Sequence, residues 1–362
     1  MPGDPWASRP VIVLPAIGPV CYRALALVSQ VPRRVIIDTD PSAGVPGADV
    51  DDVLALAWAL GCPELVVEGI TVVAGNVELV EAVPSALQAL EILGRADVPV
   101  YAGAARPLVR DREEITAFLR GRGNDPLARA LWRNVPPPTT KLAPRPGRAA
   151  EFIVETVMAA PGEITVVPIG PLTNIALALA LEPRVAAAVR EIVFMGGNLR
   201  GQHPAITPVE FNLGNDPEAG QLVVRSGARV TMIGLDVTTQ THLTLEDLAA
   251  ATRSDTEAAA FVRRITEPWI RFVCERRGIP GCWLHDPLAV VAVVDRGVVG
   301  TERMELGVEL RGETTYGQTL GRRGGFGGGI RPPRGGAADV AMTVDTPRFM
   351  GRFLPGLTTA LS

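Results

Sequence analysis

Lysine is almost absent from this chain of 362 residues, in which Lys141 is the only one. No run of basic residues compensates for this, and the net charge at pH 7 is -4. Because binding to nucleic-acid phosphates requires clustered Lys and Arg side chains, we expect no nucleic-acid partner. Histidine is also scarce, with three residues, so a histidine inside a polar cluster is informative.

Cysteine is scarce as well, and the four residues Cys21, Cys62, Cys274 and Cys282 are far apart. This spacing suits reduced thiols in a cytoplasmic protein better than a disulfide framework. A pairing of Cys274 with Cys282 stays open.

The chain also lacks an uninterrupted apolar run of membrane length. Residues 11–31 are apolar, but Pro15, Pro19 and Arg23 interrupt them, which makes a poor membrane span. The same stretch supplies the parts of a secretory signal only loosely. We therefore expect a cytoplasmic protein without a membrane partner, in which residues 1–33 are an N-terminal extension.

Apolar residues make up 47% of the chain, which is enough for a large core. Apolar runs typical of strands alternate with helical patterns such as residues 53–60. The expected strands cover residues 35–37, 66–73, 98–101, 164–169, 192–195, 230–235 and 339–344. This alternation predicts an α/β fold with an open, mostly parallel sheet flanked by helices on both faces, in a single domain over residues 34–355.

Residues 321–336 interrupt this pattern with eight glycines and several arginines. A segment of this composition is typical of a flexible loop. A Gly/Arg-rich RNA-binding tail has the same composition, but another expected strand follows the segment. We therefore interpret residues 321–336 as an insertion within the domain.

Five carboxylates surround the end of the first expected strand: Asp38, Asp40, Asp49, Asp51 and Asp52. Carboxylates this close repel one another unless protons or a metal neutralise them, and hard oxygen ligands favour calcium or magnesium. An acid at a helix start is also favoured by the helix dipole, which would explain one or two of the five. The cluster therefore predicts a metal site at the carboxyl end of the strand.

Six sequence blocks resemble the nucleoside hydrolases, which include the inosine-uridine-preferring enzymes. They are Asp38–Pro41 with Asp51–Asp52, Val73–Asn76, Gly170–Asn174, Phe194–Gly197, Glu210–Asn212 with Asp216–Ala219, and His285–Val290. The blocks keep the family order over residues 34–350, which is nearly the whole chain. Any single block can arise by chance, whereas six in order are specific.

The resemblance implies hydrolysis of the N-glycosidic bond of a ribonucleoside to ribose and a free base, in nucleoside salvage or catabolism. It also implies one tightly bound calcium ion and a homodimer or homotetramer. The chemistry suits these residues, because the ribosyl ring gains positive charge as the bond breaks. The site must then present carboxylates, position a water molecule and help the base to leave.

The resemblance also implies a role for each matching residue. Asp40, Asp52, Asp286 and the backbone carbonyl of Ile169 would bind calcium, and Asp40 would also be the general base. The ribose hydroxyls would contact Asp51, Asn76, Glu210 and Asn212, and Met195 would pack against the sugar. His285 would lie near the base and protonate or orient the leaving group.

Several of these residues have a structural alternative. Asp216-Pro217 and Asp286-Pro287 both have the form of a helix cap, which we favour for Asp216. For Asp286 we favour metal ligation, because the preceding His285 and the distant acid cluster together indicate a shared site. Asn76 and Asn198 follow glycine, so each also suits a turn, and the role of Asn198 stays open.

Two side-chain arrangements near the expected site also have two interpretations. Glu210 and Asn212 alternate about Phe211, which predicts one face of an extended segment, although a solvated strand edge gives the same pattern. Trp283 either stacks on the base or belongs to the core.

The chain departs from the family pattern at three places. Extra residues, including Asp49, separate Asp40 from Asp51, so Asp49 is an alternative ligand. Pro204 stands near a position where the family has an Asn that contacts the sugar. Arg122 replaces a histidine in residues 121–127, which we expect to form a mobile loop near the base.

Proteins of other functional classes could carry the same residues. Asp38-x-Asp40 after a strand also resembles the phosphotransferases of the haloacid dehalogenase type, but those need a lysine and Lys141 lies in a Pro-rich stretch. A noncatalytic nucleoside- or ribose-binding protein with a disabled metal loop would keep the same pocket residues. A hydrolase that acts on a modified riboside would keep them too.

Overall fold

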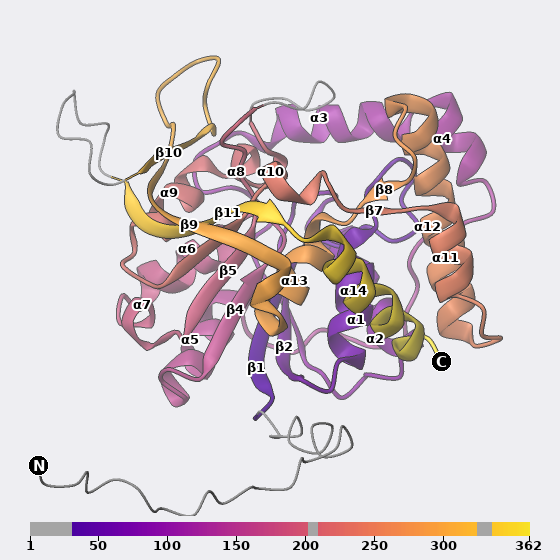
Figure 1. The fold of residues 1–362 in the computed structure, drawn as a ribbon, viewed down its shortest axis with the longest axis horizontal. Helices are drawn as coiled ribbons and strands as arrows, with labels where there is room; N and C mark the ends of the chain where they lie inside the picture. The colour runs from indigo at the N-terminus through magenta and orange to yellow at the C-terminus, as the bar shows by residue number, and fades with distance from the viewer. Residues whose placement is uncertain (1–30, 202–208, 324–334) are drawn as a thin grey trace, which may run out of the picture. The chain divides into compact units, whose positions relative to one another are not determined.

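Nine strands form one sheet in this computed structural model, which describes residues 31–201, 209–323 and 335–362 (Figure 1). In spatial order they are β10 (Thr319–Arg323), β9 (Val299–Val308), β11 (Gly336–Val344), β6 (Val230–Ile233), β5 (Glu191–Met195), β4 (Ile164–Pro168), β1 (Arg33–Thr39), β2 (Leu65–Val72) and β3 (Val100–Ala102). Strand β9 runs antiparallel to β10 and β11, and the other neighbouring strands of the sheet pair in parallel. The predicted mostly parallel sheet is therefore confirmed.

Helices cover both faces of this sheet. One face carries α1 (Asp51–Gly61), α2 (Leu79–Ile92), α13 (His285–Val294) and α14 (Thr346–Ala360), and the other carries α5 (Ala149–Ala159), α6 (Thr173–Leu181), α7 (Val185–Ala188) and α9 (Pro217–Arg225). Figure 1 shows these two groups on opposite sides of the strands.

The remaining elements are short or peripheral, apart from one long helix. They are α3 (Arg112–Gly123), α4 (Pro126–Leu131), α8 (Phe211–Asn215), α10 (Leu235–Thr238), α11 (Leu245–Ala251), the long α12 (Glu257–Arg277), the 3-10 helix η1 (Arg296–Val298) and a small antiparallel pair, β7 (His242–Leu243) and β8 (Cys282–Trp283). Figure 1 shows α3, α8 and α10 near one end of the sheet.

The two-sided burial of the sheet explains its apolar strands. Within β1, Val35 and Ile37 belong to the core under α1, whereas Ile36 belongs to the core under α5 and α6. Successive side chains of a strand point to opposite faces, so a strand covered on both faces is apolar throughout. Helix α1 is also buried along its length, because α2, α13 and α14 pack against it. It ends where Pro63 restricts Cys62 to an extended conformation.

Three local predictions were wrong. Residues 210–212 do not form an extended segment: Glu210 caps the short helix α8, to which Phe211 and Asn212 belong. Residues 121–127 are not a loop, because α3 runs to Gly123 and α4 begins at Pro126 after the cap residue Asp125. The strand expected over residues 230–235 stops at Ile233, because α10 starts at Leu235.

Some predictions fall on residues outside the described part of the chain. These are most of the extension predicted over residues 1–33, residues 324–334 of the Gly/Arg-rich segment, Pro204 and Cys21. The two ends of the Gly/Arg-rich segment are strand residues, since Arg323 ends β10 and Gly336 begins β11. The described cysteines, Cys62, Cys274 and Cys282, are free thiols.

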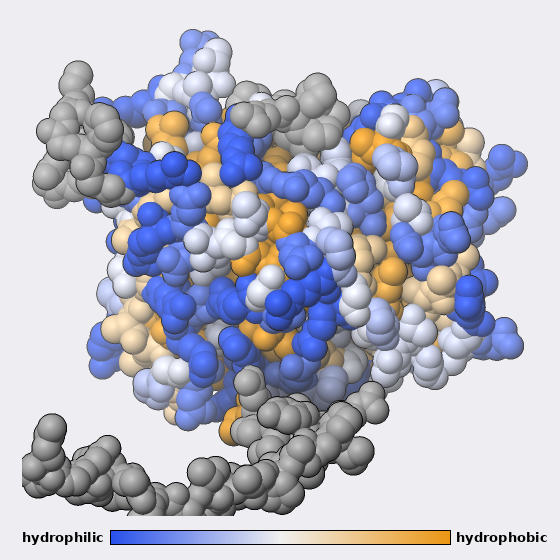
Figure 2. All heavy atoms as spheres, in the orientation of Figure 1, coloured by the Kyte–Doolittle hydropathy of each residue, from blue (hydrophilic) through white to orange (hydrophobic). Residues whose placement is uncertain are grey.

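Large apolar side chains are mostly inside. Figure 2 shows hydrophilic residues spread over the visible face, with hydrophobic areas that are small and interrupted. Within the described ranges, none of the helices combines the length and the apolar character that a membrane crossing requires.

Candidate functional site

The ends of the parallel strands bring the predicted site residues to one edge of the sheet. Asp40 follows β1, Asn76 follows β2, Ile169 follows β4, and Met195 ends β5. Helices α1 and α13 both begin at this edge, so Asp51 and Asp286 enter from their first turns. Residues that are far apart in the sequence therefore meet here, as expected for an open parallel sheet.

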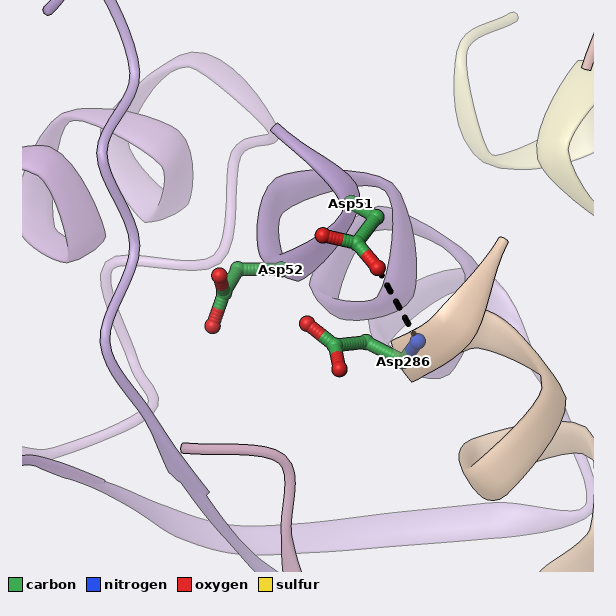
Figure 3. A group of neighbouring side chains, drawn as sticks. All are labelled: Asp51, Asp52 and Asp286. Atoms are coloured by element: carbon green, nitrogen blue, oxygen red, sulfur yellow. Dashed lines mark hydrogen bonds between the residues drawn. The ribbon is translucent and has the colours of Figure 1, made fainter. Parts of the chain in front are cut away.

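Asp51, Asp52 and Asp286 form a compact group of carboxylates. One oxygen from each lies within 4.8 Å of the others, and all three residues are buried. Figure 3 shows the three side chains converging on one space from α1 and α13. The Asp286 N–H donates to Asp51 Oδ2 at 3.1 Å, which ties the two helix starts together. Asp51 therefore stands among the acids that can hold a metal ion, as the acid cluster predicted, whereas the family resemblance implied only a contact with the ribose.

Asp40 lies beside this group. Its N–H donates to Asp52 Oδ1 at 3.0 Å, and its Oδ2 accepts from the Asn76 N–H at 2.7 Å. Its Oδ1 is buried without a hydrogen-bond partner among the described residues. Two glycines make room for the carboxylate: a Cβ at Gly75 would lie 1.9 Å from Oδ2, and one at Gly170 would lie 2.8 Å from Oδ1.

Burial and mutual repulsion shift the pKa values of these acids. Burial, followed by the charge of neighbouring carboxylates, raises the pKa values of Asp40, Asp51 and Asp286 well above the usual range. Burial also raises the pKa of Asp52, to about 6. Hydrogen bonds from Thr39 and the Asp40 N–H offset part of this rise. Buried carboxylates with an orphaned oxygen and no cationic side chain among them fit a hard metal ion.

The backbone carbonyl of Ile169 is also at the site. It accepts a hydrogen bond from Asn212 Nδ2 at 2.8 Å, and a carbonyl oxygen has a second lone pair for another partner. Asn212 Nδ2 also approaches the Met195 carbonyl at 3.3 Å. The short helix α8 thus positions the side chain of Asn212 between two strand ends.

Glu210 is held by backbone donors. Its carboxylate accepts the N–H groups of Asn212, Leu213 and Gly197 at 2.7 to 3.0 Å. Burial nevertheless raises its pKa. Glu210 and Asn212 are both buried, so these residues do not form a solvated strand edge.

His285 is buried at the start of α13. Its Nδ1 and Thr238 Oγ1 are 2.7 Å apart, which fixes the orientation of the ring. Burial lowers the pKa of His285 to about 4, so the imidazole is neutral at neutral pH. The ring of Trp283 lies 5.5 Å from the His285 ring, and the Arg277 guanidinium lies 5.3 Å from the Trp283 ring. Trp283 is both buried and part of the cavity wall, so it has features of both predicted roles.

Asp216 and Asp38, two acids from the motif blocks, accept hydrogen bonds that hold the fold together. Asp216 accepts hydrogen bonds from the N–H groups of Ala219 and Leu108 and from Thr173 Oγ1, so the helix cap predicted for it is confirmed. Asp38 Oδ2 accepts from Asn174 Nδ2 at 2.7 Å and from Thr71 Oγ1.

A cavity of about 1010 Å³ opens in front of these groups. Its wall contains every predicted site residue except Asp40 and Asp52, namely Asp51, Asn76, Ile169, Met195, Glu210, Asn212, His285 and Asp286. Asn76 links the wall to the residues behind it, since its Nδ2 lies 3.3 Å from Asp52 Oδ2.

The cavity wall also contains residues that sequence motifs did not predict. Phe118 from α3, Arg277 at the end of α12 and Tyr316 from the β9–β10 connection are examples. They lie outside the six motif blocks, and the only signal in the sequence was their type: aromatic rings and a guanidinium suit a planar base.

The family model described as "Inosine-uridine preferring nucleoside hydrolase" matches residues 35–351. An inosine-uridine preferring nucleoside hydrolase from Crithidia fasciculata is 34% identical over 331 residues, covering 90% of this chain and 98% of the relative.

Solved structures agree with the sequence comparison. A purine-preferring ribonucleoside hydrolase from Gardnerella vaginalis superposes with a TM-score of 0.77 at 33% identity, covering 91% of this chain and 99% of the other. A plant nucleoside hydrolase gives a TM-score of 0.78 at 30% identity, with 90% and 99% of the two chains covered.

Proposed function

Because the chain belongs to the inosine-uridine preferring nucleoside hydrolase family, we propose that it hydrolyses the N-glycosidic bond of a ribonucleoside with the help of calcium. The observation that carries the proposal is the group of buried carboxylates from Asp51, Asp52 and Asp286, with Asp40 beside it. The chain is a nucleoside hydrolase; the ion and the residue roles are the proposed part.

The oxygen donors suit calcium. Asp40, Asp52, Asp286 and the Ile169 carbonyl would hold the ion, and Asp51 is close enough to be a further ligand. When bound, calcium supplies a positive charge that holds the attacking water and two ribose hydroxyls in place. The raised pKa values of these acids support the proposal, because a cation would stabilise their charged forms.

Asp40 is the proposed general base. Asp40 Oδ1 has no partner among the described residues and accepts a proton from the attacking water. The water oxygen bonds to C1′, and the bond between C1′ and the base nitrogen breaks with its electron pair leaving on the base. The Asn76 N–H holds the other carboxylate oxygen, which keeps Asp40 oriented.

The ribose lies against the strand ends. Asp51, Asn76, Glu210 and Asn212 present polar groups to its hydroxyls, and Met195 packs against the ring. Backbone donors hold Glu210, so its carboxylate is positioned before the substrate binds. Such preorganised groups favour the transition state, in which the ribosyl ring carries positive charge.

His285 is the proposed neighbour of the base. With its pKa lowered to about 4, the neutral ring acts through a hydrogen bond and not as an imidazolium acid. The contact between Thr238 Oγ1 and Nδ1 leaves Nε2 as the atom available to the base.

The test is release of free ribose from purine and pyrimidine nucleosides, with calcium present and after chelation. Calcium-dependent release supports the proposal and ranks the bases. If a folded, calcium-bound protein binds nucleosides without releasing ribose, it is a noncatalytic binding protein. Release from modified ribosides alone would instead identify a hydrolase with a modified substrate.

We also expect a cytoplasmic homodimer or homotetramer. The oligomeric state is measured by sedimentation or light scattering of the purified chain, and a monomer at working concentration would contradict it.

A further inference from the structure

The fold leaves the guanidinium of Arg122 without a hydrogen-bonded partner at Nη2. This atom is buried, and among the described residues it donates to no acceptor. Arg122 lies at the end of α3 and belongs to the same cavity wall as Trp283 and His285. A buried N–H without an acceptor is costly, so a ligand acceptor in the cavity would stabilise it.

Packing holds Arg122 in place, and no other described residue forms an ion pair with it. The guanidinium carbon lies 5.7 Å from the centre of the Phe118 ring and 5.7 Å from that of Trp269. The segment that separates Asp40 from Asp51 packs on its backbone, since a Cβ at Gly47 would lie 2.8 Å from the Arg122 carbonyl oxygen. Two rings and a tight backbone contact therefore fix a cation at this position.

Two charged side chains lie close enough to act on Arg122. Asp49 and Arg277 are the charged groups that act on it, with opposite effects. Asp49 Oδ1 already accepts the N–H groups of Val50 and Asp51 at the start of α1. Burial lowers the pKa of Arg122 to about 10, so the side chain remains a cation at neutral pH.

We propose that Arg122 contacts the base of the substrate and stabilises the negative charge that the base gains as the glycosidic bond breaks. The inference rests on the proposed function. The electron pair of the broken bond moves onto the base, where an acceptor atom receives a hydrogen bond from the Arg122 guanidinium, and solvent later supplies the proton. The O6 and N7 atoms of a 6-oxopurine are acceptors that match a guanidinium.

The experiment compares two substrates whose bases leave with different charge. The base of inosine leaves as an anion, whereas 7-methylguanosine already carries a positive charge on its base and releases a neutral one. For Arg122→Ala we expect kcat/KM with inosine to fall by about 100-fold or more, the size typical of a lost charge-stabilising donor. With 7-methylguanosine we expect a far smaller loss. Arg122→Lys keeps the charge and should restore part of the inosine rate.

Arg120→Ala is the matched control, because it removes the same charge from an exposed position on the same helix. Arg120→Ala should leave kcat/KM unchanged with both substrates. Equal losses on both substrates in Arg122→Ala, with a lowered Tm, would mean that Arg122 only packs between the two rings, and would overturn the inference while the proposed function stands. If the wild-type protein hydrolyses neither nucleoside, the proposed function fails and this inference with it.

Discussion

Asp40 has one carboxylate oxygen bound by the Asn76 N–H and another, Oδ1, without a partner among the described residues. Asp40→Asn keeps the shape of the side chain but cannot take a proton from water. We expect kcat to fall by about 10²- to 10⁴-fold, the usual contribution of a general base. Steady-state ribose release measures this.

The fold of Asp40→Asn should survive, because the change removes one of several crowded negative charges. Circular dichroism and Tm provide the control. Turnover equal to that of the wild type would show that another group is the base.

His285 is predicted to act on the leaving base. For His285→Ala we expect the largest fall in kcat with nucleosides whose bases leave poorly. These bases depend most on the hydrogen bond that the wild-type ring supplies to the developing charge. An aryl riboside with an activated leaving group should be hydrolysed nearly as fast as by the wild type. Comparing kcat for the two substrates tests this, and equal losses would count against the role.

Thr238→Val tests how much the orientation of the His285 ring contributes, apart from the hydrogen bond that the ring makes to the base. It removes the hydroxyl that lies 2.7 Å from His285 Nδ1 and leaves the imidazole in place. We expect the same ranking of substrates as in His285→Ala, with smaller losses.

At the scale of the elements, the glycines at the strand ends set the space for the acids. A methyl group at Gly75 would lie 1.9 Å from Asp40 Oδ2. Gly75→Ala should therefore displace Asp40 and lower both calcium affinity and kcat, while the sheet remains folded. Isothermal calorimetry with calcium and ribose release measure the two effects.

Gly351→Ala is the control for this substitution. Gly351 lies within α14 and has open space around its Cα, so alanine there should raise stability by roughly 0.5–1 kcal/mol without changing activity. Unchanged calcium binding in Gly75→Ala would show that the Asp40 carboxylate moves without consequence for the metal.

The strands and the start of α1 could be predicted from sequence because the signals are local. Apolar runs indicated the strands, and the acids after Asp38 marked the edge where ligands bind. The cap at Asp216 was also local, since Asp-Pro supplies both the acceptor and the first helical residue.

The errors occurred where a short element depends on its surroundings. The alternation of Glu210, Phe211 and Asn212 suits a strand, but the Glu210 carboxylate accepts backbone N–H groups and starts α8 instead. Around Arg122 the family pattern suggested a loop, whereas α3 continues to Gly123 and lines the cavity. Helices this short or this Gly-rich have weak intrinsic signals, and tertiary contacts decide their form.

At the scale of the whole molecule, the site joins residues that are more than two hundred positions apart in the sequence. Asp51 and Asp286 share a hydrogen bond and open two helices that pack against each other. The acid cluster in the sequence already included Asp51, but its contact with Asp286 could not be predicted from spacing along the chain, because it follows from how α1 and α13 meet. Metal binding should therefore stabilise the fold as a whole.

Calcium is expected to raise the Tm, since an ion that binds only the folded state adds about 2.7 kcal/mol at a concentration 100 times its Kd. Asp286→Ala should lose most of this shift and be at least as stable as the wild type without calcium, because it relieves repulsion among buried acids. Scanning calorimetry with calcium and with a chelator measures both states.

Asp216→Ala is the matched comparison, because Asp216 also precedes a proline at a helix start but caps α9. Asp216→Ala should lower the free energy of unfolding by roughly 1 kcal/mol or more, the energy of a lost helix cap. The resulting fall in Tm should be the same with and without calcium. The two Asp-Pro pairs thus separate a carboxylate that stabilises the chain by itself from one that stabilises it only through a metal. If calcium raised the Tm of Asp286→Ala as much as that of the wild type, Asp286 would not be a ligand. Asp40, Asp51 and Asp52 would then be the acids that hold the ion.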